Sequence, residues 1–179
     1  KERHLPENCR ETINTILKET YGYEQFRNLE IYDDLSKGKE KLCISQGQLI
    51  ENVILEAEKA WKGETQVDNI LLTAPTGSGK SLLFQLPAIY LGKEYNLLTI
   101  VVSPLKALIV DQVESLQELG YTRVAYASSD LSPEQKMEVY RQVREGEIDL
   151  FYLSPELLLS YDIKHFVGER RIGLVVVDE

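Results

Sequence analysis

Residues 74–81 read Ala-Pro-Thr-Gly-Ser-Gly-Lys-Ser, and they follow the apolar run Asn-Ile-Leu-Leu-Thr at residues 69–73. The apolar run predicts a strand, and the residues that follow position 81 have the pattern of a helix. A glycine-rich turn between a strand and a helix leaves backbone N–H groups free to converge on a phosphate, because no Cβ obstructs the curl. We therefore predict that residues 74–81 form a phosphate-binding loop.

The loop contains the first candidate site residues. Lys80 supplies a point charge for the β and γ phosphates of a nucleotide, and the hydroxyl of Ser81 is available to Mg²⁺. The usual pattern has glycine where this chain has Ala74, but the context of strand, loop and helix compensates for that departure. The predicted phosphate contacts are Thr76, Gly77, Ser78, Gly79, Lys80 and Ser81.

A second apolar run, residues 172–177, ends in Asp178 and Glu179. One carboxylate at such a strand end can hold hydrated Mg²⁺, and another can orient or deprotonate an attacking water. Acidic pairs also end buried strands simply because the chain reaches water there, so this interpretation depends on the loop in the same chain. We predict an ATPase that uses ATP and Mg²⁺, with Lys80, Asp178 and Glu179 as catalytic residues and Ser81 and Asp178 as metal ligands.

The composition is that of an ordinary globular protein, with 43% hydrophobic and 27% charged residues. No apolar stretch is long enough to span a bilayer, so we expect a cytoplasmic protein without a membrane partner, or a nuclear one in a eukaryote. The two cysteines, Cys9 and Cys43, are far apart and the chain has only two histidines. This spacing fits neither a disulfide framework nor a zinc site, so both thiols are expected to be free.

Strand and helix patterns alternate along the second part of the chain, which predicts an α/β fold with a parallel sheet and helices on both faces. Strands are expected at residues 97–102, 123–126, 148–153 and 172–177, and helices at 6–20, 48–61, 105–119, 132–145 and 156–160. Residues 28–45 are polar and predict an exposed excursion. The expected division is an N-terminal helical segment at 1–68 and an ATPase domain at 69–179.

Several ordered motifs resemble those of superfamily-two helicases, and of the RecQ family in particular. Residues 76–88 resemble motif I, residues 101–113 are similar to motif Ia, residues 150–156 look like the end of the motif Ib segment, and residues 21–27 resemble the start of motif 0. The resemblance implies the first RecA-like P-loop NTPase domain of such an enzyme. In that fold, a strand encoded after motif II lies between the loop strand and the motif II strand. We therefore expect a domain incomplete at its C-terminal end, truncated after motif II and nearly inactive alone.

Motif 0 of this family stacks an aromatic ring on adenine and reads the adenine edge with a glutamine amide. The resemblance gives Tyr23 the stacking role and Arg27 a supporting one, but the expected glutamine position soon after Arg27 holds Glu30. A carboxylate cannot donate a hydrogen bond unless it is protonated. If residues 28–45 are an insertion, Gln48 takes the position of the expected glutamine. The alternative is that Gln48 is a solvated residue at a helix start.

Motifs Ia and Ib imply contacts to a nucleic-acid backbone. A proline at a strand end fixes the chain so that the next N–H groups can face a phosphate. The candidates are Ser103, Pro104 and Lys106 in the first segment and Ser154, Pro155 and Glu156 in the second. The net charge of −9 argues only weakly against this partner, because backbone amides and helix N-termini also bind phosphates.

The resemblance implies an ATP-dependent DNA helicase or translocase that moves 3′-to-5′ on single-stranded or partly duplex DNA. A second RecA-like domain of the same longer chain would supply the arginine finger, which is not evident in these residues. Three alternatives stay open: an RNA helicase, a double-stranded DNA translocase of a restriction or defence system, and an ATP-binding interaction module that unwinds nothing.

Overall fold

The structure is a computed structural model, and it describes residues 8–32, 41–73 and 77–178. The chain divides into two compact units, residues 1–87 and residues 88–179. Thr76 and Glu179, both predicted site residues, lie outside the described residues, as do Ala74 and Pro75.

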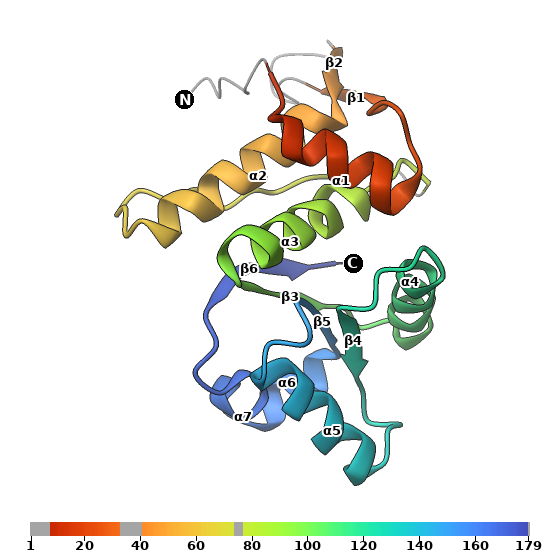
Figure 1. The fold of residues 1–179 in the computed structure, drawn as a ribbon, viewed down its shortest axis with the longest axis vertical. Coiled ribbons are helices and arrows are strands. Elements are labelled where there is room, and N and C mark those ends of the chain that lie inside the picture. Colours follow the sequence, from red (N-terminus) through yellow and green to blue (C-terminus); the bar gives the residue numbers. More distant parts are fainter. Residues whose placement is uncertain (1–7, 33–40, 74–76, 179) are drawn as a thin grey trace. The chain divides into compact units, whose positions relative to one another are not determined.

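Two helices and a hairpin form most of the first unit (Figure 1). Helices α1 (Glu11–Tyr21) and α2 (Gln46–Trp61) bury apolar residues three and four positions apart, as the 3.6-residue period requires. Between them, β1 (Asn28–Tyr32) pairs antiparallel with β2 (Lys41–Ser45), with Asn28 opposite Ser45. The polar excursion predicted at residues 28–45 is therefore a hairpin in its described parts. The buried residues of the two helices include Ile13, Ile16, Leu17, Ile50, Ile54 and Ala57.

An arginine before α1 connects this helix to α2. The Arg10 guanidinium lies 2.5 Å from Glu51 Oε1 and 2.7 Å from Glu58 Oε1. These two glutamates are two helical turns apart and so share one face of α2. Because both carboxylates are almost buried, they need this cation as a partner.

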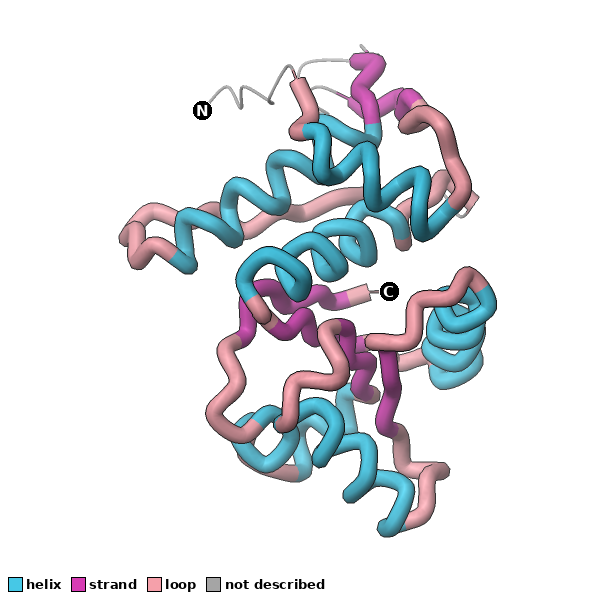
Figure 2. Tube along the Cα trace, viewed as in Figure 1, coloured by secondary structure: helices cyan, strands magenta, loops and turns pink. Residues whose placement is uncertain are grey.

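The second unit contains a four-stranded parallel sheet, drawn in magenta in Figure 2. Its strands are β3 (Leu98–Val102), β4 (Val124–Ala127), β5 (Leu150–Leu153) and β6 (Ile172–Val177), in the order β4-β5-β3-β6. The central strands β3 and β5 are buried at every position, which explains their unbroken apolar sequence. All four predicted strands of this part of the chain are confirmed.

Helices cover both faces of this sheet. Phe151 of β5 packs in one apolar cluster with residues of α5 (Pro133–Arg144), α6 (Pro155–Ser160) and α7 (Ile163–Val167). The next residue, Tyr152, points to the other face and bonds to α4 (Lys106–Glu118), because alternate strand residues face opposite ways. The five-residue helix α7 was not predicted, since a single turn is too short to show a period.

The remaining helix, α3 (Leu82–Tyr95), contains the boundary between the two units at Pro87. Within the second unit, a Cβ on Gly92 would come within 2.5 Å of the Asp149 side chain. Glycine is therefore required where the end of α3 passes over the start of β5.

The strand predicted at residues 69–73 is not present. Neither described sheet includes these residues, and Leu71 is 89% exposed. A strand needs a hydrogen-bonded neighbour as well as apolar side chains, and no described strand pairs with this run. The prediction of a strand before the phosphate-binding loop is therefore wrong for this structure.

An ionic cluster around the buried Asp149 lies at the amino ends of β4 and β5. Asp149, which is 3% exposed, accepts hydrogen bonds from Arg123 Nε at 2.6 Å and from Arg170. Arg170 also donates to the carbonyl of Ile148, and Arg123 donates to the carbonyl of Gly146. The hydrogen bond from Arg123 to Asp149 raises the pKa of Arg123. The cluster connects the segments that precede β4, β5 and β6.

Candidate nucleotide and nucleic-acid site

The described part of the predicted phosphate-binding loop has the backbone conformation that its glycines favour. Gly77 has φ 79° and Gly79 has φ 82°, in the left-handed region that favours glycine. Between them, Ser78 Oγ is buried and makes no hydrogen bond to any described residue. A buried hydroxyl without a described partner, beside a curled backbone, fits a loop whose N–H and O–H groups donate to phosphate oxygens.

Lys80 and Ser81 begin the turn that leads into α3. The Lys80 carbonyl accepts from Leu83 N–H, and the Ser81 carbonyl accepts from Gln85 N–H, each at 2.9 Å. Both residues are half-buried. The loop and helix of the predicted unit are thus present, although the strand before them is not.

Gln46 contacts the loop and was not predicted. This residue is 3% exposed, and its Oε1 accepts from the Arg27 backbone N–H at 3.1 Å. Its Nε2 lies 3.5 Å from the carbonyl oxygen of Gly79, and a Cβ on Gly79 would come within 2.7 Å of that nitrogen. No local pattern indicates this role, since a glutamine beside a helix start is usually solvated.

The predicted adenine-binding residues have clear positions in the first unit. Tyr23 is half exposed, and its ring stacks on Tyr21 with the centroids 6.4 Å apart. Gln48 is the third helical residue of α2, and its Oε1 accepts from the Ser45 N–H at 3.1 Å in a capping box. Arg27 is exposed, and Glu30 lies opposite Cys43 in the hairpin. Gln48 therefore caps a helix, and its adenine contact stays a prediction.

Asp178 directly follows β6. Its backbone N–H donates to the Val102 carbonyl at 2.9 Å, and its carboxylate accepts from Gln112 Nε2 at 3.3 Å. Asp178 thus follows the carboxyl end of a parallel strand, where α/β folds bind their ligands.

The first predicted nucleic-acid segment connects β3 to α4. Ser103 is buried, with Oγ accepting from the Leu105 N–H, while Pro104 is exposed. Helix α4 starts at Lys106 without a side-chain cap. The Lys106 ammonium lies 2.8 Å from Asp130 Oδ1, and this exposed ion pair lowers the pKa of Asp130.

The second segment connects β5 to α6. Ser154 caps α6 by accepting from the Leu157 N–H, Pro155 occupies the first turn, and Glu156 is exposed beside it. The Ser103 N–H donates to the Leu153 carbonyl at 3.2 Å, so the two segments begin at neighbouring strand ends. The sheet therefore brings Ser103, Ser154 and Asp178 to one edge of the second unit.

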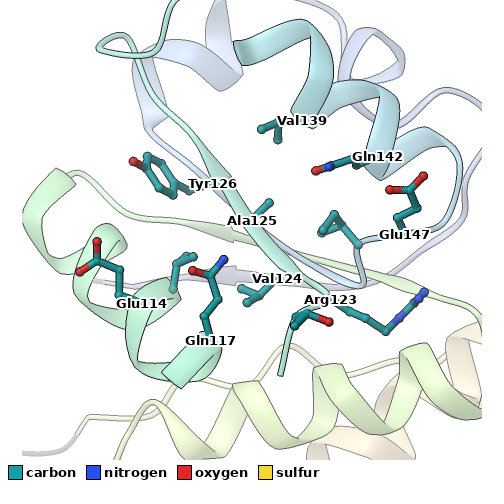
Figure 3. A pocket seen from close by; sticks show the side chains of 12 residues that line it. Glu114, Gln117, Arg123, Val124, Ala125, Tyr126, Val139, Gln142 and Glu147 are labelled. Atoms are coloured by element: carbon teal, nitrogen blue, oxygen red, sulfur yellow. The ribbon is translucent and has the colours of Figure 1, made fainter. Parts of the chain in front are cut away.

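A groove of about 550 Å³ lies along the free edge of β4, between α4 and α5 (Figure 3). Polar side chains from both helices point into it, among them Glu114, Gln117 and Gln142. It contains none of the predicted site residues, and Asp178 follows the strand at the opposite edge of the sheet.

Both cysteines are free thiols, as predicted. Burial, together with the charge of Glu51, raises the pKa of Cys9. Among the described residues, no three histidine, cysteine or acidic side chains gather as a metal cluster, and no helix is long and apolar enough to cross a membrane.

The sequence profile of DEAD/DEAH box helicases matches residues 46–179. The chain belongs to the DEAD/DEAH box helicase family. Within this family, it is similar to the ATP-dependent DNA helicase RecQ of Synechocystis sp. (strain ATCC 27184 / PCC 6803 / Kazusa), with 32% identity over 95% of this chain and 29% of that protein. It is 33% identical to the ATP-dependent DNA helicase Q-like 5 of Arabidopsis thaliana over 94% of this chain and 15% of that protein. The RecQ helicase of Bacillus subtilis (strain 168) is 31% identical over 92% of this chain and 23% of its own length.

The chain therefore spans less than a third of each of these relatives. A solved structure of the DUF1998 helicase MrfA bound to DNA has a similar fold, with a TM-score of 0.52 and 21% identity over 91% of this chain and 18% of that one. The predicted fold class and the resemblance to RecQ-like helicases are confirmed by these comparisons.

Proposed function

We propose that this chain is the ATP-binding part of the motor of a RecQ-like DNA helicase, which translocates 3′-to-5′ along single-stranded DNA. The observation that carries the proposal is the backbone of the loop, with Gly77 and Gly79 at positive φ around a Ser78 hydroxyl that has no partner among the described residues. Family membership and the RecQ relatives support the helicase assignment. A protein that acts on DNA would work in the cytoplasm, or in the nucleus of a eukaryote.

The residues present suit a nucleoside triphosphate with Mg²⁺. The N–H groups of the loop bind phosphate oxygens, and Lys80 neutralises the β and γ phosphates. The hydroxyl of Ser81 and the carboxylate of Asp178 are hard oxygen donors, and Mg²⁺ is usually held by one or two carboxylates together with substrate phosphates. When bound, the metal neutralises charge that develops on the transferred phosphoryl group.

Hydrolysis then depends on positioning and charge. Glu179 orients or deprotonates the attacking water, while Lys80 stabilises the negative charge of the β and γ phosphates. We propose that a second RecA-like domain of the same protein supplies the arginine finger, which in other NTPases increases the rate by roughly 10³ to 10⁵. Tyr23 stacks on adenine, Arg27 supports it, and Gln48 reads its edge once the amide leaves the capping box.

Nucleic acid binds at the carboxyl edge of the sheet in this proposal. The first N–H groups of α4 lack a side-chain cap, so they can bind a backbone phosphate beside Lys106. The exposed ion pair of Lys106 with Asp130 is no obstacle, because such pairs contribute little and can exchange for a phosphate. Ser154, Pro155 and Glu156 form the neighbouring contact. The structure of MrfA bound to DNA supports DNA as the polymer.

Replacing Lys80 by alanine tests the nucleotide site. We expect Lys80→Ala to weaken ATP binding by at least about 10-fold, because a charge-assisted contact to phosphate contributes roughly 1.5–3 kcal/mol. The measurement is competition of ATP against a fluorescent nucleotide, in the full-length protein. Lys93→Ala is the matched control, since Lys93 is an exposed lysine of α3, the helix that follows the loop. Equal ATP affinity in the two variants would refute the proposed site.

A further inference from the structure

Three hydrogen-bonded side chains connect β5, α4 and the end of β6 within the second unit. The hydroxyl of Tyr152 donates to Gln112 Oε1 at 2.8 Å. The Nε2 of Gln112 in turn donates to Asp178 Oδ2 at 3.3 Å. We call Tyr152, Gln112 and Asp178 the relay.

The chemistry of a primary amide suits the middle position. A glutamine side chain has an oxygen that accepts and an NH₂ group that donates. Because Tyr152 bonds to the oxygen, the NH₂ group is directed at Asp178. An ionised carboxylate only accepts hydrogen bonds, so this orientation is the one that holds it.

Burial of its members restrains the relay and strengthens its hydrogen bonds. Tyr152 is 1% exposed and sits in the central strand β5, so its hydroxyl has little freedom to move. Gln112 and Asp178 are both half-buried, so the hydrogen bond between them is partly shielded from water. A hydrogen bond to a charged group is stronger than a neutral one, and more so when partly desolvated.

Each member of the relay is close in sequence to a predicted functional segment. Gln112 follows Lys106, the first residue of α4, by less than two helical turns. Tyr152 precedes Ser154, the cap of α6, by two residues. Asp178 is the predicted ligand for Mg²⁺. The relay therefore connects both proposed nucleic-acid contacts to the proposed metal ligand.

We infer that Gln112 is a positioning residue that couples nucleic-acid contact at α4 and α6 to the Asp178 carboxylate. A shift of α4 or of the β5 end moves Gln112, and with it the carboxylate to which it donates. This role rests on the proposed ATPase, and no contact of Gln112 with nucleotide is required. Residues that orient a metal ligand in this way typically change metal affinity or activity by 10- to 100-fold when replaced.

Gln112→Glu is the most informative change, because it keeps the shape and the acceptor for Tyr152 but removes the donor to Asp178. We expect Mn²⁺ binding in the presence of ADP, measured by paramagnetic titration of the full-length protein, to weaken by about 10-fold. Nucleotide affinity without metal should change less than about twofold, because the loop backbone and Lys80 are untouched. Stimulation of ATP hydrolysis by single-stranded DNA should fall in parallel.

Gln117→Glu is the matched control, since Gln117 is exposed on the same helix and the charge change is identical. Tyr152→Phe should shift Mn²⁺ affinity in the same direction as Gln112→Glu. The double variant should be no weaker than Gln112→Glu alone, because the relay is already broken. Equal thermal unfolding of the two glutamate variants shows that the fold is intact.

Equal Mn²⁺ affinity and DNA stimulation in Gln112→Glu and Gln117→Glu would overturn the relay and leave the proposed function standing. An unaltered protein that neither binds Mn²⁺ with ADP nor hydrolyses ATP would overturn the proposed function, and the relay with it.

Discussion

At the scale of single residues, Gln46 joins segments that are far apart in the chain. Its amide oxygen holds the backbone of Arg27, and its nitrogen lies beside the Gly79 carbonyl. Because both partners are backbone groups, the contact fixes the positions of two loops without depending on their side chains. We propose that Gln46 supports the phosphate-binding loop, whereas Gln48 serves the adenine.

These two glutamines give opposite predictions for nucleotide choice. Gln46→Leu should weaken the binding of ATP and of GTP equally, since the phosphates are common to both nucleotides. It should also lower the stability by about 1–3 kcal/mol, because the Arg27 N–H loses its acceptor. Gln48→Leu should weaken the binding of ATP more than that of GTP. It should also lower the stability by roughly 1 kcal/mol, because the helix cap is lost. Competition binding with both nucleotides, together with thermal unfolding, measures each effect.

Unchanged discrimination in Gln48→Leu would remove the adenine role and leave Gln48 as the capping residue that the structure shows. A selective loss of ATP binding in Gln46→Leu would instead give that role to Gln46.

Much of the candidate site was predictable at this scale because its signals are local. Glycines at 77 and 79, a lysine and a serine in fixed order, and an acidic pair after an apolar run need no knowledge of distant contacts. Gln46 and Gln112 were missed for the opposite reason. Each acts through partners more than 18 residues away in sequence, and nothing in the spacing of a polar side chain reveals such partners.

At the scale of elements, apolar runs and helical periodicity predicted the strands and most of the helices of the second unit. Strand β6 was predicted with the bounds that it has, and α5 with its cap at Ser132. Residues 69–73 are the exception. They have the apolar composition of a strand, but pairing is a property of two segments and cannot be read from one.

The ionic cluster around Asp149 gives a prediction at this scale. Asp149→Asn should destabilise the protein by about 3–5 kcal/mol, because it leaves Arg170, whose side chain is 5% exposed, as a buried cation without its counter-charge. Chemical unfolding measures the loss. Asp111→Asn, the same change at an exposed position of α4, should leave the midpoint where it is. Equal midpoints in the two variants would show that the cluster contributes nothing to stability.

At the scale of the whole molecule, family membership and the loop geometry point to one account. The chain belongs to the DEAD/DEAH box helicases, and it is 28–33% identical to RecQ-type helicases over 92–95% of its length. The sequence could predict this because ordered motifs are specific together even where each is weak alone. We propose that DNA is the substrate and that a second RecA-like domain completes the ATPase site.

The proposed ATPase is tested most directly by measuring ATP hydrolysis by the full-length protein with and without single-stranded DNA. We predict that DNA increases the rate, and that Asp178→Asn lowers the DNA-stimulated rate by at least about 100-fold, because the metal-bound charge stabilisation is worth several kcal/mol. Asp111→Asn should retain the rate of the unaltered protein. A rate of ATP hydrolysis that does not change when DNA is added, or that is the same in Asp178→Asn, would contradict the proposed function.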